Sequence, residues 1–382
     1  MTIQSTRKIL NRDFLLTFFA QFASYCAYCA LVPTFPIYLL KLGCTEVEIG
    51  VLIGILGISS TVLRPFIGKA LLKISERNFM VGGAFVLTFC FMAYLLAPPF
   101  WPLLIVRVFQ GIGTALFYTA SVILIANISP ETHRGQSFSY FYLAFHFSFA
   151  VAPSFGMFLI NRFGFKPLFF VCAGLSLCSL LITLRLGERT IDPLESQSIP
   201  DQLFFKRESL PPVIMTFLSS LVWGAIAAFF PLYALNHGVT NPGLFFSAFA
   251  ITIILGRALG GRILDLHSRE SVILPCLIIF VLAIGILLFS KTLSTFILVA
   301  AIWGIGHAFF YPALTAYVLD LAGSSRGPAM GIFTAVDDLG MGLGPVIMGI
   351  ILRLTSYPIM FLCLVLTALI NLSYFYFFVK KQ

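Results

Sequence analysis

The chain has 382 residues, of which 59% are hydrophobic and only 10% are charged. Because a soluble domain carries about 25% charged residues, a chain of this length with so few charges cannot cover itself with a water-facing surface. The composition therefore excludes a soluble globular protein and predicts an all-α membrane protein that crosses the bilayer many times.

Twelve apolar stretches follow one another along the chain. A transmembrane helix needs about 20 predominantly apolar residues, and charged residues, glycines and prolines mark the breaks between stretches. The predicted helices cover residues 14–40, 47–72, 79–97, 99–127, 136–161, 165–186, 211–236, 242–266, 271–290, 292–320, 327–352 and 357–379.

One long polar segment, ERTIDPLESQSIPDQLFFKRESL, interrupts this series at residues 188–210. It predicts an N-terminal six-helix bundle at 1–187, a cytoplasmic linker at 188–210 and a C-terminal six-helix bundle at 211–382. With the N-terminus inside, 16 of the 24 Lys and Arg residues lie in cytoplasmic segments and 5 on the opposite side. By the positive-inside rule, both termini are expected to be cytoplasmic. This bias also explains the net charge of +9 without nucleic acid. The polar start, MTIQSTRKILNRD, shows no removable signal peptide.

The two halves repeat the same landmarks in the same order, which is the signature of internal duplication. PTFPIYLLKLGCT (33–45) matches AAFFPLYALNHGVT (227–240) at an offset of 195, and HRGQS (133–137) matches SRGPA (325–329) at 192. RPFIGKALLK (64–73) matches RALGGRILDL (257–266), and GIGTALFYTA (111–120) matches GIGHAFFYPA (304–313), both at 193. Parallel repeats of this kind predict two pseudo-symmetric bundles, a binding site near the membrane midplane between them, and alternating access by rocking.

The loop after the second helix of each half resembles the signature G-x-x-x-D-(R/K)-x-G-R of the major facilitator superfamily. The second half carries it as GRILDLHSR, with Gly261, Asp265 and Arg269 in place. The first half keeps Gly68 but has Leu72 where the family has Asp. In that family the Asp holds the cytoplasmic gate by capping and ion pairing, so the resemblance implies gating roles for the matching residues.

Arg64 and Arg257 end the second and eighth helices at the cytoplasmic side. We interpret both as anchors of the gate that also contact lipid headgroups, without a role in substrate binding.

Helix four carries RVFQGIG, which resembles the family pattern R-x-x-Q-G-x-G, with Arg107 and Gln110 at the matching positions. The equivalent Arg is implicated in proton coupling in that family; the alternative interpretation of Arg107 is a structural partner for backbone carbonyls or a gate carboxylate. Helix five keeps only Pro153 and Gly156 of the glycine run typical of the antiporters. The whole chain most resembles the bacterial drug- and metabolite-efflux branch, which includes exporters of sugars and siderophores.

Two histidines lie inside predicted spans, His146 in helix five and His307 in helix ten. Imidazole titrates between pH 5 and 8, so both are candidates for proton coupling, and His307 also for substrate binding. The alternative for each is a core histidine with a satisfied hydrogen bond. The five scattered histidines have no Cys or carboxylate at ligand spacing, so we expect no metal site and no cofactor.

Polar and aromatic residues recur at helical spacing on four predicted cavity helices. Gln21, Tyr25 and Tyr28 share one face of helix one at i, i+4 and i+7. An aromatic stripe in a chain with 42 Phe can equally be packing, but mixed amide, phenol and indole groups favour a substrate-binding surface. The other candidates are Gln110, Thr114 and Tyr118 in helix four, Trp223 beside Ser220 in helix seven, and Trp303, His307 and Tyr311 in helix ten.

Two adjacent aspartates, Asp337 and Asp338, interrupt the apolar helix eleven in the stretch FTAVDDLGMGLGP. A charge at the bilayer centre costs about 2.5–3.5 kcal/mol, and two close carboxylates cannot both ionise cheaply, so we expect at least one to carry a proton near neutral pH. The repeat pairs Asp338 with His146 and Asp337 with Phe145, which favours Asp338 as the cavity member. The alternative is that both aspartates neutralise Arg107 or bond across helices.

The predicted function is secondary transport, proton-coupled export of a drug-, sugar- or siderophore-like molecule from the bacterial inner membrane by a monomer. No nucleotide-binding P-loop is present, so ATP is not expected to drive it. Two alternatives stay open: a proton-coupled uptake symporter, and a membrane protein that senses or handles lipids without pumping solutes. A membrane enzyme is not expected, because no nucleophile–base pair stands out.

Overall fold

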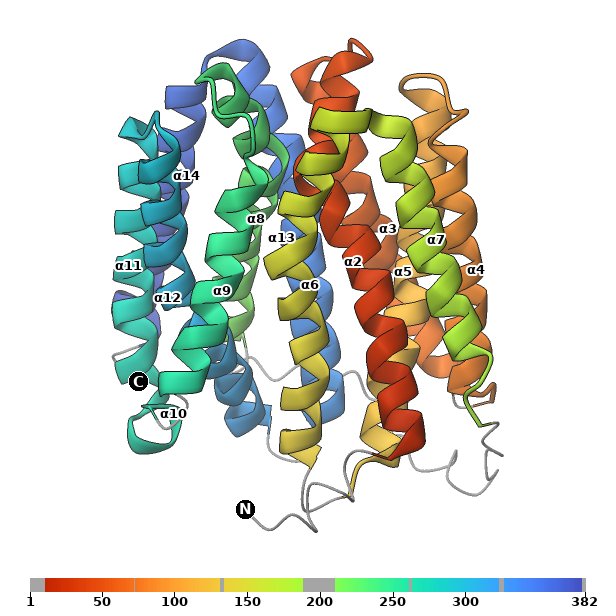
Figure 1. Ribbon diagram of the computed structural model, residues 1–382. Coiled ribbons are helices and arrows are strands. Elements are labelled where there is room, and N and C mark those ends of the chain that lie inside the picture. Colours follow the sequence, from red (N-terminus) through yellow and green to blue (C-terminus); the bar gives the residue numbers. More distant parts are fainter. Residues whose placement is uncertain are drawn as a thin grey trace. The chain divides into compact units, whose positions relative to one another are not determined.

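The computed structural model of the protein describes residues 11–71, 73–130, 134–187, 210–260, 263–322 and 326–379. Within these ranges every regular element is a helix, and twelve of the helices have 18 or more residues (Figure 1). The first six long helices are α2 (Arg12–Lys41), α3 (Glu46–Ala70), α4 (Glu76–Ala93), α5 (Trp101–Ile128), α6 (Arg134–Phe163) and α7 (Phe165–Thr183). The second six are α8 (Leu210–Asn236), α9 (Gly243–Gly260), α11 (Arg269–Phe289), α12 (Leu293–Ala322), α13 (Arg326–Leu354) and α14 (Tyr357–Tyr374).

The twelve long helices confirm the twelve predicted stretches, with small shifts at their ends. Eleven of them are long and apolar enough to cross a membrane. The remaining one, α4, begins with the polar residues Glu76, Arg77 and Asn78, which lower its mean hydropathy. The predicted span 242–266 divides into α9 and a four-residue helix α10 (Ile263–Leu266), and α14 continues into a π-helical turn η4 (Phe375–Val379).

Turns between helices show the internal repeat in the backbone. Gly43 follows α2 with φ +81°, and Gly238 follows α8 with φ +78°, a conformation that residues with a Cβ rarely adopt. These two glycines are equivalent positions of the duplicated PTFPIYLLKLGCT segment. Thr45 then begins α3 with a capping box, because its backbone N–H donates to Glu48 at 2.7 Å while the Glu48 N–H donates back to the Thr45 hydroxyl at 3.4 Å.

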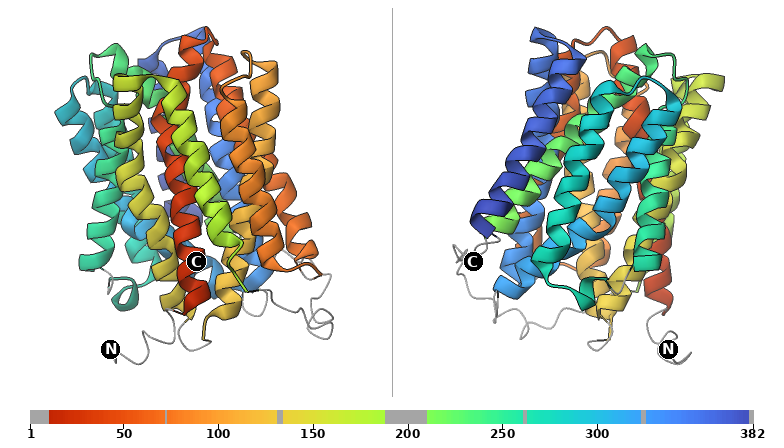
Figure 2. Two further views of the ribbon diagram at one scale, coloured as in Figure 1. Left: turned by 45° about the vertical axis from the view of Figure 1, so that its right-hand side comes forward. Right: turned by 90° about the vertical axis from the view of Figure 1, so that its left-hand side faces the viewer.

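The chain divides into two compact units, unit 1 (Met1–Leu31 and Ser59–Asp201) and unit 2 (Val32–Ile58 and Gln202–Gln382). In unit 1, α4 packs against α5 and α7, and α4 and α7 lie side by side in Figures 1 and 2. Phe14, Ile125 and Phe141 join α2, α5 and α6 in a buried apolar cluster.

Unit 2 is built on the contact of α8 with α13 and of α11 with α12 and α14. The helices α11 and α14 lie side by side in Figure 1 and in the right-hand view of Figure 2. Phenylalanine side chains pack together between α8, α9 and α12. Phe230 lies 4.1 Å from Phe245 and 5.0 Å from Phe296, measured between ring centroids.

Candidate functional site

The carboxylate of Asp337 lies at the centre of the polar contacts in unit 2. Ser220 on α8 donates a short hydrogen bond to one carboxylate oxygen. Tyr311 on α12 donates to the other oxygen at 2.9 Å. Three helices therefore meet at one ionisable group inside the predicted membrane spans. The sequence predicts Ser220 and Tyr311 as polar residues of cavity helices, and Asp337 as the partner of Asp338 in helix eleven.

Glycines bring α8 and α13 close enough for the short serine side chain to reach the aspartate. A Cβ added to Gly340 would lie 2.7 Å from the backbone oxygen of Phe217, and one added to Gly344 would overlap the backbone oxygen of Leu221. Gly224 on α8 approaches the backbone of Met341 in the same way. Small residues are the usual means by which membrane helices approach closely, and here they set the close approach of α8 and α13 in the turns that follow Asp337.

The internal repeat places a second triad at the equivalent positions of unit 1. Ser220, Tyr311 and Asp337 correspond to Tyr25, Tyr118 and Phe145 at the offsets 195, 193 and 192. The ring centroid of Tyr25 lies 4.9 Å from that of Phe145 and 5.9 Å from that of Tyr118. The same three positions thus meet in each unit, as an aromatic cluster in unit 1 and as a carboxylate with two hydroxyl donors in unit 2.

His307 lies in a box of aromatic rings, one turn before Tyr311 on the same face of α12. Its ring stacks on Phe280 at 4.6 Å and lies 5.2 Å from Phe249 and 5.3 Å from Trp303, between centroids. Trp223 of α8 stacks on Phe249 at 4.8 Å and completes the box. The Nε2 atom of His307 is buried and makes no hydrogen bond among the described residues. Two other predicted substrate-binding residues, Trp223 and Trp303, therefore lie around this histidine, but its surroundings are apolar.

Two more of the predicted binding residues take part in unit 1 contacts. Ser121 on α5 donates a hydrogen bond of 2.9 Å to the side-chain oxygen of Gln21 on α2. The guanidinium carbon of Arg64 lies 5.4 Å from the ring centroid of Tyr118, a distance typical of a cation–π contact. Arg64 therefore lies beside the predicted binding residues, although the sequence assigns it to the gate alone. Tyr28 is half-buried on α2.

Arg107 and Gln110 form a separate network between α5 and α4. Arg107 donates to the side-chain oxygen of Gln110 at 2.7 Å, and the hydroxyl of Tyr94 donates to the same oxygen. All three side chains are buried. The hydroxyl of Thr114 donates to the backbone oxygen of Gln110 within α5. The matched family motif is thus arranged as a charge-assisted network inside unit 1.

Asp338 and His146 occupy the other pair of equivalent polar positions. Asp338 is half-buried on α13, and its backbone oxygen approaches α3 so closely that a Cβ on Gly57 would lie 2.8 Å from it. His146 is buried on α6, and its ring centroid lies 5.5 Å from that of Phe145.

The predicted gating residues are described in part. Arg269 donates to Asp320 at 3.1 Å and so links the start of α11 to the end of α12. Arg257 donates to the backbone oxygen of Ala308 at 3.3 Å, and a Cβ on Gly68 would meet open space. Gly261 and the side chain of Asp265 lie outside the described part of the chain.

Sequence reasoning missed several residues that complete these contacts. Tyr94 follows α4 directly and Ser121 belongs to an ordinary apolar helix, so neither carries a local signal. Phe249 and Phe280 are two of 42 phenylalanines, and only the fold singles them out. Among the described residues, no group of three or more His, Cys, Asp or Glu side chains is placed to hold a metal ion.

Comparisons with known proteins agree with this architecture. The sequence profile of the Major Facilitator Superfamily matches residues 17–240 and 212–382. Among solved structures, that of a mutant of the nucleoside transporter NupG superimposes with a TM-score of 0.80 at 15% identity, over 96% of this chain and 99% of that chain. A likeness at this identity concerns the fold.

Three relatives match along most of their length. An uncharacterised MFS-type transporter of Methanocaldococcus jannaschii is 26% identical over 89% of this chain and 91% of its own. The quinolone resistance protein NorA of Staphylococcus aureus is 24% identical over 89% of this chain and 90% of its own. The staphylopine export protein of Staphylococcus aureus is 25% identical over 84% of each chain.

Proposed function

The chain belongs to the major facilitator superfamily, and we propose that it exports a small organic molecule in exchange for protons. As a member of this family it is a multi-pass membrane transporter of small molecules. The observation that carries the proton-coupled part of the proposal is the carboxylate of Asp337, which sits between hydroxyl donors from α8 and α12.

Protonation of Asp337 changes the contacts between three helices. The ionised carboxylate accepts from Ser220 and from Tyr311. Once one oxygen carries a proton, that oxygen becomes a donor and one of the hydroxyls must find another acceptor. Protonation of Asp337 therefore weakens the hydrogen bond from α13 to either α8 or α12. In the proposal, this loss allows the helices to move when a proton binds.

On the basis of these contacts we propose Asp337, in place of Asp338, as the proton carrier. The repeat alone favours Asp338, because its equivalent is the titratable His146. Asp337, however, has two hydroxyl donors from neighbouring helices, and its equivalent triad in unit 1 has no carboxylate. The carboxylate appears in only one of the two duplicated triads, so the packing of the repeat does not by itself require it.

Alternating access requires movement between the first six helices and the second six. Gly50 and Gly54 of α3 approach the backbone of Pro345 and Gly342 on α13 so closely that a methyl group on either glycine would overlap a backbone oxygen. Arg353 at the end of α13 adds an ion pair of 3.5 Å to Glu46 at the start of α3. In the proposed cycle these contacts separate when the binding site opens at the end of the helices that carries Glu46 and Arg353.

The direction of transport rests on the relatives. One of them is named for staphylopine export and another for quinolone resistance, and both names describe removal of a compound or protection against one. We therefore propose export, and organic compounds as substrates.

The proposed location is the bacterial inner membrane, with both termini in the cytoplasm. Arginines gather at one end of unit 1, where Arg12 donates to the backbone oxygen of Arg185 at 3.2 Å and Arg77 to that of Leu184 at 2.8 Å. Basic residues at one end of a bundle favour the cytoplasmic side.

The test uses the purified full-length protein in proteoliposomes with a trapped pH-sensitive dye. Staphylopine and a fluorescent quinolone are offered separately outside vesicles with an acidic lumen. Proton exchange predicts accumulation of one of them together with a rise in lumenal pH. Asp337→Asn is expected to reduce this coupled flux at least tenfold, while Asp338→Asn, the matched control, retains most of it.

Other outcomes separate the alternatives. Uptake that requires an acidic exterior identifies a symporter and overturns export by exchange. A loss of flux in Asp338→Asn with full flux in Asp337→Asn would identify Asp338, the residue that the repeat favours, as the proton carrier. If both variants transport at the wild-type rate with the wild-type pH response, neither aspartate is the carrier.

A further inference from the structure

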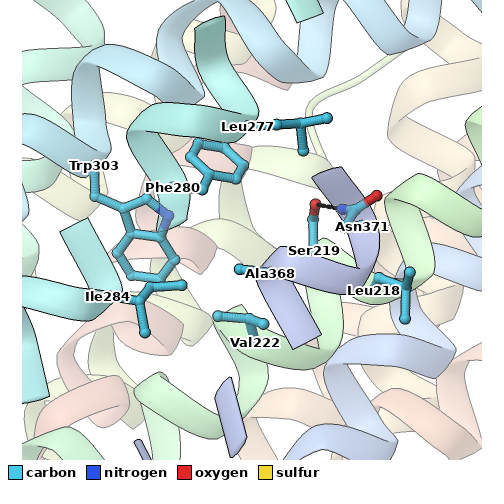
Figure 3. Close-up of a pocket in the computed structure, with 9 residues that line it drawn as sticks. All are labelled: Leu218, Ser219, Val222, Leu277, Phe280, Ile284, Trp303, Ala368 and Asn371. Carbon is cyan, nitrogen blue, oxygen red and sulfur yellow. Dashed lines mark hydrogen bonds between the residues drawn. The ribbon is translucent and has the colours of Figure 1, made fainter. Parts of the chain in front are cut away.

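A small pocket lies inside unit 2 between α8, α11, α12 and α14, and Asp337 is not among its lining residues. Its walls are mostly apolar. Its cavity volume of about 10 Å³ is close to the smallest volume that holds one water molecule. Figure 3 shows the lining residues, with Trp303 beside Phe280 on one side and Ser219 with Asn371 on the other.

Two polar atoms of the lining have no hydrogen-bond partner among the described residues. One is the indole Nε1 of Trp303, which is a donor, and the other is the side-chain oxygen of Asn371, which is an acceptor. Their side chains are only 1% and 2% exposed, so bulk solvent does not satisfy them. A buried polar group without a partner loses its hydration without replacement, and native interiors rarely leave one in that state.

The orientation of Asn371 is set by its other contacts. Its amide nitrogen donates to the backbone oxygen of Met215 at 3.0 Å and to the hydroxyl of Ser219 at 2.9 Å, and the second of these bonds is the dashed line in Figure 3. With both amide hydrogens engaged, the amide cannot be turned over without losing these bonds, so its oxygen stays unpaired. The hydroxyl of Ser219 accepts this bond and keeps a proton that it can donate.

We propose that the pocket is a binding site for ordered water. A water molecule accepts from the Trp303 N–H or the Ser219 hydroxyl and donates to the Asn371 oxygen, which are the hydrogen bonds that the lining leaves open. The hydrated pocket connects α12 with α8 and α14. It lies on the side of α12 that carries Trp303, one helical turn before His307. The site is independent of the proposed proton carrier and of the direction of transport.

The test is a pair of nearly isosteric substitutions at Ala368, a pocket-lining residue of α14. Ala368→Val and Ala368→Thr fill the same space and displace the water, but only Thr replaces its hydroxyl group. We expect Ala368→Thr to unfold at a higher temperature than Ala368→Val, by about 2 °C or more. Because overpacking affects both variants alike, it does not alter their order.

Ala283 supplies the matched control, because it is fully buried in α11 but is not among the pocket residues. There, Val is expected to be at least as stable as Thr. The same order at Ala368 as at Ala283 would show that the lining offers no open hydrogen bond to hold a water, and that result overturns the proposal.

An experimental density map of the wild-type protein provides a second measurement. Density for a water is expected within hydrogen-bond distance of Trp303 Nε1 or of the Asn371 side-chain oxygen. A map that resolves ordered water elsewhere in the protein interior but shows none in this pocket contradicts the inference.

Discussion

At the scale of single residues, the difference between the two aspartates of α13 lies in their neighbours. Adjacent residues on a helix point about 100° apart, so Asp337 and Asp338 cannot face the same neighbours. Asp337 has a serine from α8 and a tyrosine from α12 as donors. Hydrogen bonds to an ionised group are roughly twice as strong as those between neutral groups, so the two hydroxyls hold the carboxylate in a defined position.

Removing one of these donors tests their contribution. Tyr311→Phe keeps the ring that packs 5.5 Å from Phe333 but deletes the hydroxyl that donates to Asp337. We expect coupled transport in proteoliposomes to fall by about 10- to 150-fold, which corresponds to the loss of a charge-assisted hydrogen bond of about 1.5–3 kcal/mol.

Tyr317→Phe on the same helix is the control, because it removes a tyrosine hydroxyl that is not one of the two donors to Asp337, and it is expected to transport normally. Equal rates for Tyr311→Phe and the wild type would falsify a role for this bond in coupling.

At the scale of elements, the glycines of α13 explain how a helix with two aspartates fits among its neighbours. Gly340 and Gly344 face α8, while Gly342 meets Gly54 and Ile58 of α3. Within the segment GMGLG, the first and last glycines therefore contact α8, and the middle glycine contacts α3. Glycines of this kind are expected from the sequence to permit close packing, but their partners become known only from the fold.

A methyl group at Gly344 is expected to destabilise unit 2. Its Cβ would overlap the backbone oxygen of Leu221, and backbone cannot yield as a flexible side chain can. Gly344→Ala should therefore lower the unfolding temperature in detergent, with a loss of about 1–3 kcal/mol from overpacking.

Gly331→Ala is the matched control on the same helix, because a Cβ there meets nothing within 4 Å. It is expected to unfold at or slightly above the wild-type temperature, since alanine favours helix over glycine. The explanation by close backbone contact fails if the two variants are equally stable.

At the scale of the whole molecule, the contact between α3 and α13 joins the start of the second helix in the first half to the end of the eleventh. Glu46 and Arg353 form an ion pair there, and both side chains are partly exposed. An exposed ion pair contributes little stability, which suits a contact that forms and breaks during each transport cycle.

Tethering this contact is expected to stop transport. In a background with the eight native cysteines replaced, Glu46→Cys together with Arg353→Cys is joined by a short, reducible thiol cross-linker. Coupled flux should fall at least tenfold and recover after reduction, while each single variant treated alike retains its flux. Full transport by protein shown by mass spectrometry to be cross-linked within one chain contradicts alternating access at this end.

Much of the architecture can be predicted from the sequence because it depends on local properties. Hydropathy over about 20 residues decides whether a segment spans a bilayer, and the twelve long helices confirm that prediction. Gly43 and Gly238 occupy matching positions of the repeat in the sequence, and the structure gives both of them a positive φ. The family, too, is evident from motifs such as RVFQGIG, and the match of the family profile confirms it.

The arrangement of polar side chains depends instead on which helices approach each other. The match of Arg107 and Gln110 to the family motif is visible in the sequence, but their partner Tyr94 directly follows another helix, α4, and only the fold identifies it. In the same way, His307 is a candidate for proton coupling in the sequence, whereas the structure surrounds it with Phe249, Phe280 and two tryptophans.

The sequence by itself determined the twelve helices, their duplication and the presence of a costly pair of carboxylates in the eleventh. Helical geometry separates the side chains of Asp337 and Asp338 but does not say which neighbour each one meets. Only the tertiary structure decided that, because the backbone approach of α8 to α13 through Gly224, Gly340 and Gly344 brings the Ser220 hydroxyl within reach of Asp337. Such an approach joins segments more than a hundred residues apart, and no local pattern encodes it.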